Sequence, residues 1–199
     1  MARLGSFMAD TSKSVWHQFF TIPNQLTAAR FVLSLVVFVL MPLKAYIPAM
    51  IVFIVAAATD WVDGYWARRY GQVTKLGRVF DPFVDKIIIC GAFIFLVAEP
   101  RSGVRAWMAV VVVGREMLVT ALRGFIEQSG GDFSAKMAGK LKMVFQCLAV
   151  AASLLVLSFA DHAVPSVLNP TLHILVWIAV VLTVYSGVGY VVAASKFFR

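Results

Sequence analysis

The sequence predicts an all-α integral membrane protein: six transmembrane helices, preceded by a short amphipathic helix at the membrane interface. Hydrophobic residues make up 61% of the 199 residues and charged residues only 14%, and the mean hydropathy is +0.85. A soluble domain usually has about a quarter charged residues, so this chain is better suited to a bilayer than to water. Its apolar residues also gather in stretches close to the length of about 20 residues that a membrane helix needs.

The six expected spans follow one another with short connections. They cover residues 27–43, 46–58 (continuing into a charged stretch), 81–98, 104–125, 141–160 and 172–194. Prolines fall at or near the expected connections, where they disturb helical hydrogen bonding least; these are Pro42, Pro48, Pro100 and Pro165. We expect one domain over residues 1–199, with residues 1–26 as an N-terminal segment and residues 27–199 as the six-helix core.

The interfacial helix is predicted from an apolar pattern that precedes the first span. Large apolar side chains recur at near-helical spacing, namely Val15, Trp16, Phe19, Phe20 and Ile22. Polar His17 and Gln18 lie between them, as in a helix that lies flat in the headgroup region. The alternative is an N-terminal tail without regular structure.

Basic residues give the chain a net charge of +8 and predict its orientation. They lie between apolar runs, which favours anionic headgroups or phosphate substrates as partners and argues against nucleic acid. Most of them occur before the first span, in the second and fourth connections, and at the C-terminus. By the positive-inside rule, both termini and these connections face the cytoplasm. We therefore expect a multi-pass protein of the inner (cytoplasmic) membrane.

Four aspartates near the second connection are the strongest indication of chemistry. Asp60 and Asp63 lie at the end of the second expected span, and Asp81 and Asp85 at the start of the third. Spacings of three and four residues put each pair on one face of a helix. Carboxylates in membrane helices are costly and are usually functional. An ion-paired helix junction and a cation or proton transporter are the alternatives, although a transport site is expected nearer the middle of the bilayer.

The aspartates predict a site for hard divalent cations. Four carboxylates in a poorly hydrated pocket repel one another, and a divalent cation with oxygen ligands relieves that repulsion. No Cys or His accompanies them, which argues against zinc. Two Mg²⁺ or Mn²⁺ ions in such a pocket would stabilise the attacking and leaving oxygens of a phosphoryl transfer.

The sequence around these aspartates resembles the signature of the CDP-alcohol phosphotransferases. The matching positions are Asp60, Asp63, Gly64, Ala67, Arg68, Gly77, Asp81 and Asp85, with no error in spacing. The resemblance implies that an acceptor hydroxyl attacks the phosphorus of a CDP-linked lipid and that CMP leaves. It implies that all four aspartates ligate metal and that Asp85 is the catalytic base. It also implies binding of the CDP-lipid by Gly64, Arg68, Thr74 and Gly77.

Other segments resemble the branch of this family that uses glycerol 3-phosphate, the phosphatidylglycerophosphate synthases. One segment runs from Ile22 to Arg30 and adds Asn24 and Thr27 to the expected CDP-lipid contacts. The others contain Arg115, Arg123, Lys140 and Lys142, which are the candidate residues for binding the acceptor phosphate. The resemblance implies CDP-diacylglycerol and glycerol 3-phosphate as substrates, and a homodimer.

Simpler interpretations of the four cations remain open. Arg115 lies well inside the fourth span, so it needs a partner, and Glu116 or an acid on another helix would serve. Lys140 and Lys142 would also fit a role in which they only extend to the lipid headgroups. Arg123 is equally consistent with a cytoplasmic basic residue. Inositol phosphate is the alternative acceptor, because it too carries a phosphate; free inositol, serine or choline fit less well.

Overall fold

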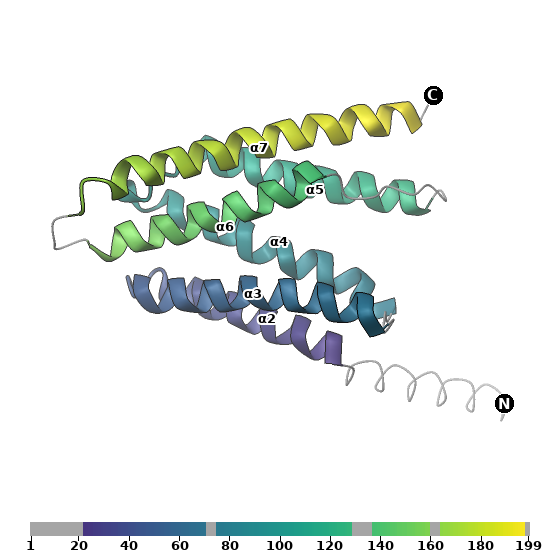
Figure 1. The fold of residues 1–199 in the computed structure, drawn as a ribbon, viewed down its shortest axis with the longest axis horizontal. Helices are drawn as coiled ribbons and strands as arrows, with labels where there is room; N and C mark the ends of the chain where they lie inside the picture. The colour runs from purple at the N-terminus through teal and green to yellow at the C-terminus, as the bar shows by residue number, and fades with distance from the viewer. Residues whose placement is uncertain (1–21, 71–74, 129–136, 160–163, 198–199) are drawn as a thin grey trace, which may run out of the picture.

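A computed structural model describes residues 22–70, 75–128, 137–159 and 164–197. All the elements in these ranges are helical, so the expected all-α fold is confirmed for them (Figure 1). They are α2 (Ile22–Leu40), α3 (Tyr46–Tyr70), α4 (Lys75–Val97), the 3₁₀ helix η1 (Pro100–Ser102), α5 (Ala106–Gln128), α6 (Met137–Ser158) and α7 (Leu168–Phe197). The expected interfacial helix lies outside the described residues, except for Ile22, which begins α2.

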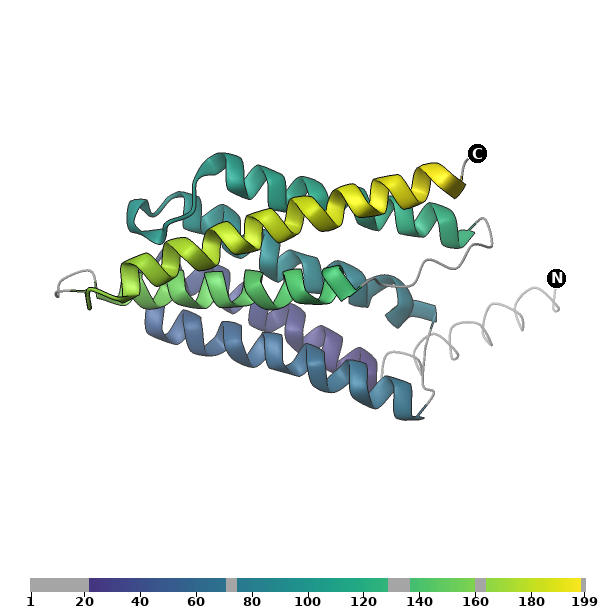
Figure 2. The same ribbon diagram turned by 45° about the horizontal axis from the view of Figure 1, so that its top comes forward.

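The six α-helices alternate in direction along one long axis (Figures 1 and 2). The start of α2, the end of α3, the start of α4, the end of α5, the start of α6 and the end of α7 therefore lie at the same end of the bundle. Helix α2 packs against α3 and α4, α6 packs against α3, α4 and α7, and α5 packs against α4 and α7. This arrangement carries both aspartate pairs, and the segments with Arg123 and Lys142, toward one end.

Several helices extend beyond the predicted apolar spans. Helix α3 continues through the charged stretch to Tyr70, α4 begins at Lys75 and not near Asp81, and α6 begins at Met137. Helix α2 begins at Ile22 and ends at Leu40, earlier than expected at both ends. Hydropathy reports only the part of a helix suited to lipid, whereas charged residues outside the hydrocarbon continue a helix at little cost.

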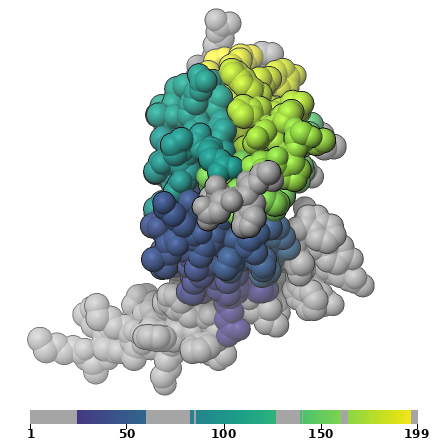
Figure 3. Space-filling view, turned by 90° about the vertical axis from the view of Figure 1, so that its left-hand side faces the viewer, coloured from purple at the N-terminus to yellow at the C-terminus, as the bar shows by residue number. Residues whose placement is uncertain are grey.

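Two connections at the opposite end of the bundle are tight. After α2, Lys44 adopts a left-handed conformation (φ 57°), and the Ala45 N–H donates to the Leu40 carbonyl at 3.1 Å. After η1, Gly103 has φ 73°, and the buried Ser102 hydroxyl donates to the Leu96 carbonyl at 2.6 Å. Figure 3 views this end, where the start of α5 (teal) lies beside the start of α7 (yellow-green), with α3 (blue) below them.

Polar side chains lie inside the bundle while large apolar side chains face outward. Among the described residues, buried polar groups include Arg30, Glu116, Lys142 and Gln146, whereas Val110 and Tyr185 are each 70% exposed. In water an outer surface of this kind would be unfavourable, because exposed apolar area is costly to hydrate. The pattern is that of a protein whose outer surface contacts lipid.

Two helices in the described ranges are long and apolar enough to span a membrane. Residues 141–158 of α6 and residues 168–195 of α7 are long and apolar enough to cross a bilayer. Shorter apolar stretches occur at residues 25–40, 46–59 and 86–97. Helix α5 carries Arg115, Glu116 and Arg123, which interrupt its apolar sequence.

Candidate functional site

The two aspartate pairs lie on helices that meet at one end of the bundle. Asp60 and Asp63 belong to α3, and Asp81 and Asp85 belong to α4. Both helices are continuous through these positions. The spacings of three and four residues therefore put the two aspartates of each pair on one face of their helix, as the sequence predicted. Asp60 and Asp63 were expected at the end of the second span, and the structure shows that α3 continues beyond them by two to three turns, to Tyr70. Asp81 and Asp85 likewise follow two turns of α4 that were not expected.

The side chains of these aspartates lie outside the described part of the structure. Within the part that is described, no group of three or more His, Cys, Asp or Glu side chains is placed to hold a metal ion. The metal site therefore stays a prediction, based on the sequence and on the positions of the four aspartates along α3 and α4. Its donor set consists of carboxylate oxygens, which suit Mg²⁺ or Mn²⁺.

Most of the expected CDP-lipid contacts lie on α2 and on the two helices that carry the aspartates, α3 and α4. Asn24 and Thr27 lie in the first two turns of α2, and Thr27 is 6% exposed. Gly64 and Arg68 belong to α3 and Gly77 to α4, but their side-chain environments, like that of Asn24, lie outside the described part. Thr74 lies outside the described residues. Because α2 packs against both α3 and α4, these positions share one region of the bundle.

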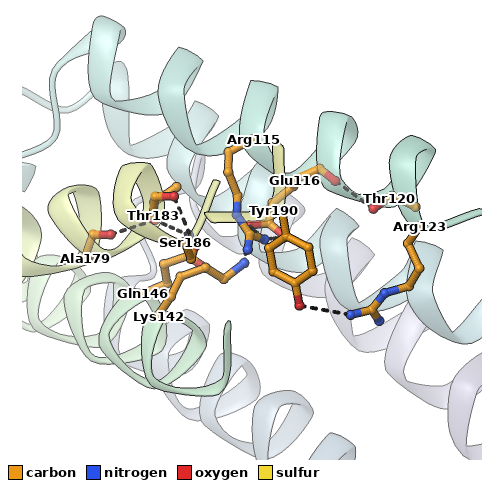
Figure 4. A network of polar contacts seen from close by, with 10 residues as sticks. All are labelled: Arg115, Glu116, Thr120, Arg123, Lys142, Gln146, Ala179, Thr183, Ser186 and Tyr190. Atoms are coloured by element: carbon orange, nitrogen blue, oxygen red, sulfur yellow. Dashed lines mark hydrogen bonds and ion pairs between the residues drawn. The ribbon is translucent and has the colours of Figure 1, made fainter. Parts of the chain in front are cut away.

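A buried cluster of charged side chains joins α5 to α6 (Figure 4). Glu116 accepts hydrogen bonds from Arg115 Nη1, at 3.2 Å to Oε1 and 3.4 Å to Oε2, and its Oε1 also accepts from Lys142 Nζ. All three side chains are buried: that of Arg115 is 9% exposed, that of Glu116 6% and that of Lys142 7%. Of the two simpler partners considered for Arg115, Glu116 and an acid on another helix, the structure shows Glu116. Lys142 does not extend to the headgroups, because its ammonium is held inside the bundle by this carboxylate.

Tyr190 of α7 brings the two arginines of α5 together. The Arg115 guanidinium carbon lies 5.4 Å from the centroid of the Tyr190 ring, and that of Arg123 lies 6.0 Å from it. Arg123 Nη2 also donates a hydrogen bond to the Tyr190 hydroxyl at 3.2 Å. Figure 4 shows the ring between the two guanidinium groups. Arg115 and Arg123 are eight residues apart in α5, which puts them close to one face of the helix, and both contact Tyr190.

Both arginines keep a donor without a partner. The Nε atoms of Arg115 and Arg123 are buried and make no hydrogen bond to any residue that the structure describes. A buried N–H without an acceptor is costly, and guanidinium groups bind phosphate through parallel N–H donors. With Lys142 the cluster has three cations and one carboxylate among the described side chains. An anion is the ligand that would satisfy both the charge and the open donors.

A second polar group lies one helical turn below Lys142. Gln146 Nε2 donates to Thr183 Oγ1 at 2.9 Å, and the Thr183 hydroxyl donates to the Ala179 carbonyl at 2.6 Å. Because the hydroxyl proton is used in this way, the Gln146 amide must present its nitrogen to Thr183. Gln146 Oε1 is buried and receives no hydrogen bond from the described part of the chain.

Helix α4 completes the surroundings of the cluster. Lys86, the residue after Asp85, interacts electrostatically with Lys142. Cys90, one turn later, is buried on a helix that packs against both α5 and α6. The cationic cluster therefore lies beside the segment of α4 that carries the second aspartate pair.

Sequence reasoning found part of this cluster. It named Arg115, Arg123, Lys140 and Lys142; the structure brings Arg115, Arg123 and Lys142 together, whereas the Lys140 side chain lies outside the described part. It missed Tyr190, Gln146 and Thr183. Gln146 had a detectable signal, because it is a polar residue four positions after Lys142 within an apolar run. Tyr190 had none, since its hydrogen-bond partner Arg123 lies 67 positions earlier in the sequence, on another helix.

Comparison with known proteins places the chain in a family. The family model of the CDP-alcohol phosphatidyltransferases matches residues 20–185. A CDP-diacylglycerol–glycerol-3-phosphate 3-phosphatidyltransferase of Bacillus subtilis is 36% identical over 188 residues, covering 86% of this chain and 93% of that protein. An enzyme of the same name from Rickettsia bellii is 33% identical over 181 residues, covering 89% of this chain and 97% of that protein.

A solved structure has the same fold. The phosphatidylinositol phosphate synthase of Mycobacterium tuberculosis, crystallised with CDP-DAG bound, aligns with a TM-score of 0.62 at 18% sequence identity. The alignment covers 93% of this chain and 92% of that chain. The family match over most of the chain agrees with the spacing of the four aspartates and with the helical fold. The chain belongs to the CDP-alcohol phosphatidyltransferase family.

Proposed function

We propose that this protein transfers the phosphatidyl group of CDP-diacylglycerol to glycerol 3-phosphate, giving phosphatidylglycerol phosphate and CMP. The observation that carries the choice of a phosphorylated acceptor is the buried cluster of Arg115, Arg123 and Lys142, and the names of the relatives favour glycerol 3-phosphate over inositol phosphate. Its three cations face a single carboxylate among the described side chains, and two guanidinium Nε atoms have no acceptor. A phosphate dianion supplies the missing charge and the missing acceptors. Relatives at 36% and 33% identity carry the name of this enzyme.

The reaction assigns separate tasks to the two halves of the site. The acceptor hydroxyl forms a bond to the phosphorus distal to the cytidine, the bond from that phosphorus to the bridging oxygen breaks, and CMP leaves. Asp85 takes the proton of the attacking hydroxyl, as a general base within hydrogen-bond reach would. Arg115 and Arg123 hold the acceptor phosphate, so that the free hydroxyl is oriented toward α4. Positioning of this kind supplies a large share of the rate in phosphoryl transfer.

The family generally uses divalent metal ions, and the residues of this chain fit that requirement. Asp60, Asp63, Asp81 and Asp85 would hold them, since all four offer the hard oxygen ligands that Mg²⁺ and Mn²⁺ prefer. The metal ions, of which we expect two, would neutralise charge on the phosphoryl group when bound. Asn24, Thr27, Gly64, Arg68, Thr74 and Gly77 are proposed to bind the CDP-lipid.

We also infer how the protein lies in the membrane. All six helices α2 to α7 would cross the inner membrane, with the aspartate end and both termini in the cytoplasm. Basic residues concentrated toward that end support this orientation. The lipid chains of the substrate would then stay in the bilayer while its headgroup reaches the aspartates. The homodimer expected from the family belongs to the same proposal.

The proposal is tested by measuring CMP release from purified protein in detergent. The protein is supplied with CDP-diacylglycerol and Mg²⁺, and with glycerol 3-phosphate, inositol phosphate, inositol or serine in separate reactions. We expect release with glycerol 3-phosphate alone, and its loss on adding EDTA. Release with inositol phosphate alone would show that the proposed acceptor is wrong but that the proposed transfer reaction is correct.

A matched pair of variants tests the role of Asp85. Asp85→Asn removes the proposed base and a metal ligand, so CMP release should fall by about 100-fold or more. Glu99→Gln is the control, because Glu99 lies at the opposite end of the bundle, where its carboxylate contacts the Tyr46 hydroxyl. Equal activity of Asp85→Asn and the control, in folded protein, would rule out the assigned role.

A further inference from the structure

We propose that Glu116 is a positioning residue, which holds Arg115 and Lys142 in the arrangement that receives the acceptor phosphate. This inference rests on the proposed function, since it concerns the same reaction. It adds a carboxylate to a site otherwise made of cations. Glu116 would act through its two partners and would not touch the substrate.

The geometry of Arg115 indicates that Glu116 fixes its orientation. Neighbouring residues on an α-helix project about 100° apart, so their side chains do not meet without bending toward each other. Arg115 Nη1 nevertheless lies 3.2 Å and 3.4 Å from the two carboxylate oxygens of Glu116. One end of the guanidinium is thus anchored, while Nε remains without a partner. An anchored arginine with an open donor is prepared to bind a second anion.

The same carboxylate holds a cation on another helix. Lys142 comes from α6, 26 positions away from Glu116, and its ammonium donates to the oxygen that also accepts from Arg115. A buried ammonium beside a guanidinium would otherwise be repelled and would lack a hydrogen-bond acceptor. The Thr120 hydroxyl donates to the Glu116 backbone carbonyl at 2.6 Å and adds a polar contact at that turn of α5. Glu116 therefore links α5 and α6 at the point where the cations converge.

The cluster keeps enough positive charge to bind a phosphate even with Glu116 present. Arg115, Arg123 and Lys142 carry three positive charges, and Glu116 carries one negative charge. The cluster retains a surplus of positive charge after Glu116 has engaged two of its members. That surplus matches a phosphate dianion, whereas a second carboxylate in the cluster would remove it. One carboxylate is thus enough to gather the cations without neutralising them.

The experiment measures steady-state kinetics for Glu116→Gln, Glu116→Asp and the Glu99→Gln control. Glu116→Gln keeps the shape of the side chain but removes the charge-assisted hydrogen bonds, so KM for glycerol 3-phosphate should rise about 10- to 100-fold. Glu116→Asp keeps the charge but withdraws the carboxylate by one methylene, and should raise KM by a smaller factor. KM for CDP-diacylglycerol should stay within about twofold of wild type in both variants, because the aspartates and the CDP-lipid contacts are untouched.

A double variant separates positioning from simple neutralisation of Lys142. If Glu116 serves Lys142 alone, adding Glu116→Gln to Lys142→Met changes nothing further. If it also anchors Arg115, the addition raises KM for glycerol 3-phosphate again, which is the result we expect. Thermal unfolding in detergent is measured alongside for every variant.

Two results would overturn the inference. One is a KM for glycerol 3-phosphate within about twofold of wild type in Glu116→Gln, or in Glu116→Asp if the first variant does not fold. The other is a uniform loss of kcat and of both KM values that follows thermal stability, as a structural ion pair would give. Failure of the proposed function is distinguishable, because wild-type protein would then use inositol phosphate, and the same comparison would be made with that acceptor.

Discussion

Tyr190 is the residue on which the two arginines of the candidate acceptor site depend. Tyr190→Phe removes the hydrogen bond from Arg123 but keeps the ring under both guanidinium groups, so KM for glycerol 3-phosphate should rise about fivefold. Tyr190→Leu removes the ring as well and should raise KM further, by the loss of two cation–π contacts. Tyr185→Phe is the matched control, since Tyr185 lies on the same helix and is 70% exposed. An equal effect of the two phenylalanine variants would contradict this role of Tyr190.

At the scale of single residues, sequence predicts charge better than it predicts partners. Arg115 and Arg123 were identifiable because a charge inside an apolar span is costly and needs a reason. The contact of Lys142 with Glu116 was not identifiable, because it depends on how α5 and α6 face each other. Tyr190 was missed for the same cause: an aromatic residue in an apolar helix is usually an ordinary packing residue.

At the scale of helices, Gly91 sets how closely α4 approaches α2. A Cβ added at Gly91 would lie 2.1 Å from Cζ of Phe38, whose ring also stacks on Phe95 with centroids 5.5 Å apart. Gly91→Ala should therefore destabilise the fold by about 1–3 kcal/mol, as overpacked positions do. Thermal unfolding in detergent measures this change.

Two further variants make the Gly91 result specific. Gly114→Ala is the control, because nothing lies within 4 Å of a Cβ added there, and its stability should be unchanged or slightly higher. Phe38→Leu combined with Gly91→Ala should recover part of the loss, since the smaller side chain leaves room for the new methyl group. If Gly91→Ala proves as stable as Gly114→Ala, the two helices are not packed as closely as the structure indicates.

The helices themselves were largely predictable, but their ends were not. All six expected spans correspond to helices, and the prolines named from sequence fall at or near their ends. The errors are largest at the aspartate end, where α4 begins six residues before Asp81 and α6 begins four residues before Leu141. The apolar stretch that hydropathy detects ends at the edge of the hydrocarbon. The backbone hydrogen bonds of the helix continue for as long as no residue breaks them.

At the scale of the whole molecule, the alternating directions of the helices bring the segments with the candidate site residues toward one end of the bundle. The aspartate pairs, Arg123 and Lys142 lie toward the end at which α2 begins and α7 ends (Figure 1). At the far end, the connection after α2 and the connection around η1 are tight and are held by backbone and serine hydrogen bonds. In the proposed reaction, the soluble acceptor and soluble CMP would therefore need access to only one face of the membrane, the face at which the basic residues gather.

This arrangement predicts which side of the membrane each end of α7 reaches. Helix α7 has 30 residues, so it is about 45 Å long and exceeds the hydrocarbon thickness of about 30 Å. In a Cys90→Ala, Cys147→Ala background, Ser166→Cys and Ser195→Cys introduce one thiol just before α7 and one near its end, both at exposed positions. A membrane-impermeant maleimide should label Ser166→Cys in intact spheroplasts, and Ser195→Cys only after permeabilisation. Labelling of Ser195→Cys in intact spheroplasts would place the aspartates outside the cytoplasm, where the substrates of the proposed reaction are not made.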